Sequence, residues 1–264
     1  MVSGPGEDAE AAAVEWRDEG VILAVYRHGE GAVVVDLLTR EHGRHAGLVH
    51  GGNSRRWRGS LQPGNQVTAR WRSRLVEQLG TYACELERAR AAALFHDRMG
   101  LAAISAVCAL CEMTIAERVP CREVFDGVVH FLDVLGTGDV WPAAYVRWEV
   151  ALLSHLGFGL DLTCCAITGR TDGLAYVSPR TGRAVVAEVA ESHRHRLLPL
   201  PSFLAGDDAA AVARHDISQG LAITGHFLDR HVLRPHGRPL PLARSRLLER
   251  LASIDTTSGE VGAP

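Results

Sequence analysis

The sequence contains no lysine, because all 28 of its basic residues are arginine. Chemistry that needs a lysine amine is therefore excluded, including Schiff-base catalysis and the phosphate-binding lysine of a P-loop. The G-x-S-x-G turn that carries the nucleophilic serine of many hydrolases is also missing. Apolar residues make up 47% of the chain and charged residues 22%. These fractions are ordinary for a globular protein and exclude a largely disordered chain, a collagen and a coiled coil.

Long apolar runs are missing too. The longest, Leu101–Cys111, ends well short of the roughly 20 residues that a membrane-spanning helix needs. Residues 1–13 carry three acidic residues and no basic one, unlike the start of a signal peptide. The six cysteines are unevenly spaced and do not form the pattern of a disulfide framework. We therefore expect a reduced, cytoplasmic protein with no membrane partner and a disordered tail at residues 1–13.

The net charge of −3 conceals a segregation of charge along the chain. Residues 16–75 have ten arginines and five acidic residues, whereas residues 76–150 have six arginines and eleven acidic residues. Positive charge confined to one segment is typical of a surface that binds an anion. A solvated arginine-rich face would give the same counts, so charge alone leaves both interpretations open.

Short apolar runs separated by turn residues predict five β-strands within residues 14–86. The runs are Gly20–Arg27, Ala32–Thr39, Arg44–His50, Asn65–Arg72 and about Tyr82–Leu86. Five short strands in so small a segment fit a closed barrel better than a flat sheet. We therefore predict an amino-terminal OB-fold at residues 14–86, a fold whose strands and loops bind oligonucleotides.

An arginine-rich loop and the strand after it supply the candidate DNA-binding residues. Arginines can contact phosphates, and an adjacent tryptophan can stack on a base, which is worth ~1–3 kcal/mol per base. Trp57 lies in a polar loop and is expected to be exposed, whereas Trp71 is in phase with Val67 and Ala69 and is expected in the core. The candidate set is Arg44, Arg55, Arg56, Trp57, Arg58, Arg70, Arg72 and Arg74.

The rest of the chain has helical periodicity, which predicts an α-helical domain at residues 87–254 and an α+β protein overall. Residues 160–190 lose this period and are expected to form a loop with a short hairpin. Residues 255–264 are small and polar, which is typical of a disordered tail. The expected helices are about 89–118, 122–135, 142–157, 217–232 and 242–251.

Several segments, in order, resemble the RecO family of DNA repair and recombination mediators. No single motif is specific, but the ordered set covers roughly residues 14–250. The similar segments are Val14–Leu23, the Gly51-Gly52 loop with its arginines, Ser60–Gly64, Leu152-Leu153, Gly157–Leu162, Cys165–Gly169 and Tyr176–Val185.

The resemblance implies a protein that binds single- and double-stranded DNA and anneals complementary strands. It further implies action in the RecF pathway with RecR and the single-stranded-DNA-binding protein, helping to load RecA on coated strands. Members bind the acidic and hydrophobic tail of the single-stranded-DNA-binding protein on the helical domain. By resemblance the chain is not an enzyme, needs no cofactor and works in the cytoplasm at the nucleoid.

The chain departs from the resemblance at a zinc site. Many family members have four zinc-binding cysteines, beginning with a C-x-x-C in the segment similar to Cys165–Gly169. Here Thr168 occupies the second position, and residues 184–192 contain no cysteine. The adjacent Cys164 and Cys165 are poorly placed for a tetrahedral site. We therefore predict a degenerate hairpin that binds no metal and is held by packing of Leu174, Tyr176 and Val185.

Two further patterns have weaker functional interpretations. Cys108 and Cys111 have the spacing of a metal or redox pair, but they lie in an apolar helix and are expected in the core. His42, His45 and His50 are expected at the surface near phosphates. Two alternatives to a recombination mediator stay open: another OB-fold nucleic-acid binder, and a metal-dependent hydrolase that uses the histidines.

Overall fold

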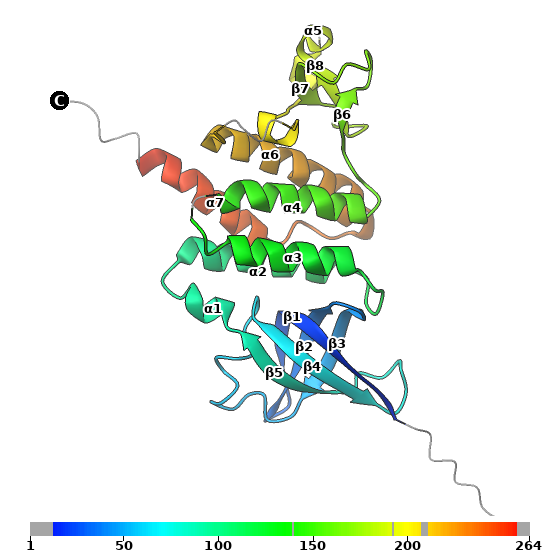
Figure 1. The fold of residues 1–264 in the computed structure, drawn as a ribbon, viewed down its shortest axis with the longest axis vertical. Coiled ribbons are helices and arrows are strands. Elements are labelled where there is room, and N and C mark those ends of the chain that lie inside the picture. Colours follow the sequence, from blue (N-terminus) through cyan, green and yellow to red (C-terminus); the bar gives the residue numbers. More distant parts are fainter. Residues whose placement is uncertain (1–12, 139, 192, 207–210, 258–264) are drawn as a thin grey trace, which may run out of the picture.

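The amino-terminal part of the chain is a closed five-stranded β-barrel (Figure 1). The computed structural model describes residues 13–138, 140–191, 193–206 and 211–257. The strand order around the barrel is β1-β2-β3-β5-β4. A small five-stranded barrel of this kind is the predicted OB-fold, so the fold prediction is confirmed. The strands are β1 (Val14–His28), β2 (Ala32–Thr39), β3 (Gly43–Val49), β4 (Gln66–Ser73) and β5 (Thr81–Arg88).

Strand β1 closes the barrel because it is long enough to pair with a different strand at each end. Its first half pairs with β4 from Val14 to Val21, and its second half pairs with β2 from Gly20 to His28. The register shifts between Ile22 and Ala24, and such irregularities bend a strand. The sequence predicted only the second half, since the charged residues before Gly20 obscure the strand pattern.

Residues on both faces of the barrel wall are buried. Ile22, Val67 and Trp71 point into the barrel, where Trp71 is 1% exposed, as predicted. Val21 and Leu23 point the other way and join the core of the helical part. The barrel and the helices therefore share a buried interface, which fixes their relative position.

The helical part lies on one side of the barrel, with α1, α2 and α3 next to it (Figure 1). The α-helices are α1 (Arg90–Ala93), α2 (Arg98–Thr114), α3 (Arg122–Val134), α4 (Trp141–His155), α5 (Ala187–Ala190), α6 (Arg214–Phe227) and α7 (Leu242–Thr257). Between them lie the π-helical η3 (Leu228–Leu233) and the 3₁₀ turns η1 (Arg194–Arg196), η2 (Ser202–Leu204) and η4 (Arg234–His236). None of the described helices is long and apolar enough to cross a bilayer.

The helix boundaries differ from the prediction at several places. The single helix expected at about 89–118 is divided into α1 and α2, because Asp97 caps the start of α2 by accepting from the backbone N–H groups of Met99 and Gly100. Helix α7 continues through residues 255–257, which were expected to begin a tail. Residues 1–12 and 258–264, the rest of the two predicted tails, lie outside the described residues.

A buried ion pair joins three helices of this part. Arg244 on α7 donates through Nε to Oε1 of Glu149 on α4 at 2.7 Å and through Nη2 to its Oε2 at 2.9 Å. The same Nη2 reaches the carbonyl oxygen of Leu221 on α6 at 2.9 Å. Both charged side chains are almost fully buried, at 3% and 0% exposure. The pair therefore depends on both partners, because either charge alone would be buried without compensation.

A small sheet is inserted between α4 and α6, in the order β6-β8-β7-β9. The predicted hairpin is formed by β7 (Leu174–Val177) and β8 (Arg183–Val186), and β6 (Asp161–Cys165) and β9 (Leu198–Pro199) extend it beyond the prediction. Leu174, Tyr176 and Val185 pack in one cluster with Cys165. The predicted packing of this hairpin is confirmed.

Candidate nucleic-acid interface

The loop between β3 and β4, residues 50–65, presents the first group of candidate arginines. Arg55, Arg56 and Arg58 are exposed. Within the described part of the chain, no carboxylate forms an ion pair with any of the three. Three uncompensated guanidinium groups on four consecutive positions are suited to contacts with phosphates. We call these residues the loop cluster.

Hydrogen bonds and close packing against the barrel fix the backbone of the loop that carries the loop cluster. The Asn65 side chain donates to the carbonyl oxygens of Gly59 and Ser60 at 3.1 and 3.0 Å. Gly52 lies so close to the barrel that a Cβ atom there would be 2.4 Å from Val33. Trp57 packs against the barrel core as a half-buried residue, so its predicted exposure holds only in part. Its ring lies 5.9 Å from the Arg56 guanidinium carbon, within cation–π distance.

Two residues that the sequence analysis missed lie at the same end of the barrel. Arg27 and His28 end β1, are exposed, and precede the tight turn to β2. The backbone N–H of Asn53 donates to the carbonyl oxygen of Gly31 at 3.4 Å, which brings the arginine loop against this turn. Only the pairing of β2 with β3 indicates this proximity, because that hairpin places the β1–β2 turn beside the end of β3.

Strand β4 carries the second group of candidate arginines, and only part of it is free. Arg70 donates to the Glu15 carboxylate on the neighbouring β1, and this hydrogen bond lowers the pKa of Glu15. Arg72 and Arg74 are exposed and form no ion pair with any described residue. Arg72 lies opposite Glu15 in the β1–β4 pairing, and its charge adds to the lowering of the Glu15 pKa. The arginines of this group that form no ion pair therefore lie at the carboxyl end of β4, and we call Arg72 and Arg74 the strand-end cluster.

Arg44 does not belong to either cluster. Its side chain is 16% exposed and lies between the barrel and the segment after α2. It donates to Asp36 at 2.7 Å, to Glu117 at 3.0 Å and to the carbonyl oxygen of Ile115 at 2.9 Å. Burial raises the pKa of Asp36 to about 6 even though Arg44 donates to it. Arg44 therefore joins the two parts of the protein, and we remove it from the candidate surface.

The two clusters lie at opposite ends of the barrel (Figure 1). Residues 50–65 lead into β4 at Gln66, whereas Arg72 and Arg74 lie near its other end. At about 3.3 Å per residue, the eight residues of β4 span ~23 Å. A ligand that contacts both clusters must therefore be extended, as a strand of nucleic acid is.

The three histidines after β2 have different environments. His45 is 3% exposed within an aromatic group with Trp71 and Tyr82, and burial lowers its pKa to about 4. His42 stacks on Trp16 at 4.1 Å and is held by Asp18. The prediction that all three lie at the surface near phosphates is thus wrong for His45, which belongs to the barrel interior. His50 is exposed beside the loop cluster.

The cysteines offer little to a metal. Cys165 is buried, and its sulfur accepts from the backbone N–H of Ile167 at 3.5 Å. Hydrogen bonds, led by that from Thr168, outweigh burial and lower the pKa of the Cys165 thiol to about 7. Cys108 and Cys111 lie in the core of α2, as predicted. Among the described residues, no three His, Cys, Asp or Glu side chains are gathered as metal ligands.

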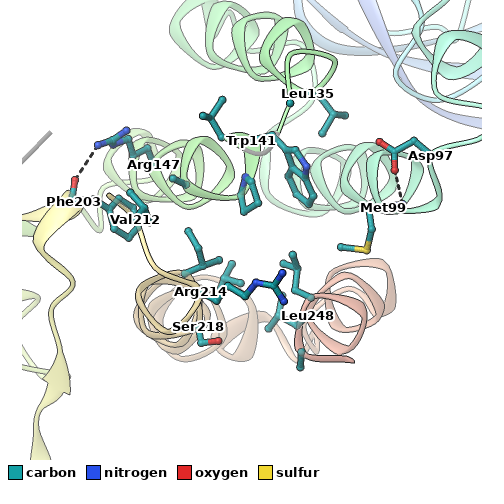
Figure 2. A pocket seen from close by; sticks show the side chains of 18 of the residues that line it. Asp97, Met99, Leu135, Trp141, Arg147, Phe203, Val212, Arg214, Ser218 and Leu248 are labelled. Atoms are coloured by element: carbon teal, nitrogen blue, oxygen red, sulfur yellow. Dashed lines mark hydrogen bonds between the residues drawn. The ribbon is translucent and has the colours of Figure 1, made fainter. Parts of the chain in front are cut away.

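The helical part contains a groove with a volume of about 1220 Å³. Its apolar lining comes from α2, α4, α6 and α7 and includes Trp141, Ile217 and Leu248 (Figure 2). Arg147 and Arg214 add two basic side chains, and Figure 2 shows Arg214 directed into the space between the helices. An apolar groove with basic side chains suits a short apolar segment that also carries negative charge.

Comparison with known proteins gives one consistent result. Residues 13–89 match the family described as Recombination protein O N terminal, and residues 96–254 match Recombination protein O C terminal. A DNA repair protein RecO of Rhodospirillum centenum is 53% identical over 95% of this chain and 100% of that protein. The corresponding protein of Rhodospirillum rubrum is 47% identical over 90% of this chain and 96% of that protein. The corresponding protein of Cereibacter sphaeroides is 49% identical over 90% of this chain and 99% of that protein.

Proposed function

Because the chain belongs to the RecO family of DNA repair and recombination proteins, we propose that it is a recombination mediator that works by binding and not by catalysis. In this proposal it binds single- and double-stranded DNA, anneals complementary strands and, together with RecR, helps to load RecA on strands coated by the single-stranded-DNA-binding protein. The work is done in the cytoplasm, at the nucleoid.

The observation that carries this proposal is a pair of exposed arginine clusters on an OB-fold barrel, in which no arginine forms an ion pair with a described residue. Phosphates of two complementary strands repel each other, and guanidinium groups reduce that repulsion when they lie between the strands or along them. The loop cluster and the strand-end cluster supply five such groups. Trp57, half-buried beside Arg56, can add a stacking surface for a base.

The apolar groove supports the proposed partnership with the single-stranded-DNA-binding protein. Its tail is acidic and hydrophobic, so its apolar side chains would enter between α4 and α7 and its carboxylates would approach Arg214 and Arg147. Arg147 is oriented by its own contacts, with its guanidinium carbon 5.4 Å from the Phe203 ring. The groove lies in the helical part, so a bound tail would leave both arginine clusters open to DNA (Figure 1).

An annealing assay tests the proposed function. Two complementary oligonucleotides, each coated with the single-stranded-DNA-binding protein, should anneal faster when the protein is added. Binding of naked strands without faster annealing of coated strands would contradict the mediator role and favour another OB-fold nucleic-acid binder.

A second measurement tests the groove. Arg214→Glu should abolish capture of the single-stranded-DNA-binding protein and leave affinity for a naked oligonucleotide unchanged. Arg230→Glu is the matched control, because Arg230 is exposed and does not line the groove. Equal capture by both variants would contradict this placement of the tail.

A further inference from the structure

The loop between β4 and β5, residues 74–80, holds aliphatic side chains in water. Leu75 is 54% exposed, Val76 52% and Leu79 38%. The loop begins with Arg74 of the strand-end cluster, and it leaves the barrel where β1 begins (Figure 1). A group of exposed aliphatic side chains on one short loop commonly marks a contact surface.

The loop is held in a defined conformation by the barrel. The indole N–H of Trp71 donates to the carbonyl oxygen of Leu79 at 2.9 Å, and the backbone N–H of Leu48 donates to the carbonyl oxygen of Gly80 at 3.1 Å. Gly80 has a φ of 63°, and a Cβ atom there would lie 2.4 Å from the Trp71 indole nitrogen. Only glycine fits this position, so the exposed aliphatic groups are presented by a built loop.

The helical part holds the same loop from the other side. Arg118, between α2 and α3, donates to the carbonyl oxygen of Val76 and to that of Gln78, the latter at 2.8 Å. Among the described residues other than glycine, Arg118 alone has a positive φ, of 60°. This conformation costs free energy and persists where the surroundings enforce it. Two parts of the protein therefore combine to fix one loop.

The charge beside the loop points to nucleic acid as its ligand. Arg74 immediately precedes Leu75, Arg72 lies two residues before Arg74, and neither forms an ion pair with a described carboxylate. Glu77 is the single acidic residue of the loop itself. Bases offer apolar faces next to anionic phosphates, and proteins insert aliphatic side chains between bases that are partly unstacked. A nucleic acid complements both parts of this surface, because its bases can meet the aliphatic side chains and its phosphates can meet the guanidinium groups.

We propose that residues 74–80 form an aliphatic wedge that binds the junction between duplex and single-stranded DNA. Leu75 and Val76 pack against the base exposed at the end of the duplex, and Arg72 and Arg74 contact the phosphates beside it. The proposal rests on the DNA binding proposed above and adds a preferred DNA structure. A mediator with such a wedge would favour the boundary at which paired and unpaired strands meet.

The experiment compares three fluorescent DNA probes of equal length: a single strand, a blunt duplex and a duplex with a single-stranded extension. Wild type should prefer the extended duplex to the blunt duplex. Leu75→Ala/Val76→Ala should bind the extended duplex roughly tenfold more weakly, because the contact with the base is lost. The control is Ile167→Ala/Leu242→Ala, since these side chains are 70% and 72% exposed elsewhere on the protein, and it should bind as wild type does.

Salt dependence separates the apolar contact from the ionic one. The slope of log K against log salt should be unchanged in Leu75→Ala/Val76→Ala and shallower by ~1.4 in Arg72→Ala/Arg74→Ala. A 2-aminopurine base at the junction should brighten when wild type binds and not when the aliphatic variant binds.

Three outcomes would overturn the proposal. The aliphatic variant could match wild type on the extended duplex, it could lose affinity for the blunt duplex equally, or it could lose only binding to RecR or to a second copy of the chain. The last result would make the loop a protein-docking surface. If wild type binds none of the probes, the proposed DNA binding fails as well, which distinguishes that failure from failure of the wedge alone.

Discussion

Replacing the loop cluster should flatten the salt dependence of DNA binding far more than replacing an equal number of paired arginines. The loop variant is Arg55→Ala/Arg56→Ala/Arg58→Ala, which removes three guanidinium groups that have no carboxylate partner among the described residues. The paired control is Arg17→Ala/Arg40→Ala/Arg70→Ala. Arg17 forms an ion pair with Glu85 at 3.6 Å, Arg40 forms one with Asp126 at 3.4 Å, and Arg70 donates to Glu15.

The expected size of the effect follows from counting contacts. Five exposed arginines without ion-pair partners, each on one phosphate of a single strand, give a log–log slope of about −3.5, and the two that remain in the loop variant give about −1.4. A fourfold rise in salt, from about 50 to about 200 mM, should then weaken wild type ~130-fold and the loop variant only ~7-fold. The paired control should keep a slope near the wild-type value, because its charges are already compensated.

Fluorescence anisotropy of a labelled single strand, titrated at several salt concentrations, measures both slopes. The two variants change the net charge equally, so a difference between them reports local contacts and not the overall field. Equal slopes for the loop variant and the paired control would refute the assignment of phosphate contacts to the loop cluster.

Three further predictions concern stability and metal content. Arg244→Ala should lower the free energy of unfolding by ~3–5 kcal/mol in urea denaturation, because it leaves Glu149 buried and uncompensated; a loss below about 1 kcal/mol would contradict a structural role for the pair. The pKa of His45 is about 4 in the folded protein and about 6.5 in the unfolded chain. The folded state therefore holds a neutral imidazole, and the stability that it has above pH ~6.5 is lost as the pH falls toward 4, by ~3 kcal/mol in total. His45→Gln should flatten the pH dependence of unfolding in that window, and an unchanged pH profile would contradict the buried imidazole. Elemental analysis should find no zinc, since Thr168 replaces a cysteine ligand; one zinc per chain would show that other residues bind it.

Much of the fold could be predicted because its elements depend on local patterns. The alternation of Val67, Ala69 and Trp71 with polar residues identified β4 and its buried face. The closure of the barrel could not be predicted in the same way, because it depends on the length of β1. Its first half, with Glu15, Arg17 and Glu19, forms a strand through pairing with β4.

The candidate site was harder to predict, because charge compensation is a property of the fold. Arg44 meets Glu117, 73 residues further along the chain, and Arg70 meets Glu15, 55 residues earlier. No local pattern indicates such partners. Conversely, Arg27 was not predicted as a site residue, because no other arginine lies near it in the sequence. Only the pairing of β2 with β1 and β3 places it beside the arginine loop.

The most direct test of the two-cluster interface is a hydrogen-exchange footprint of the full chain with and without a single-stranded oligonucleotide. We expect slower amide exchange in residues 50–65 and 72–80, at both ends of β4, and unchanged exchange in the groove lined by α2, α4, α6 and α7. Slower exchange confined to the helical part, with both arginine clusters unaffected, would contradict the two-cluster interface.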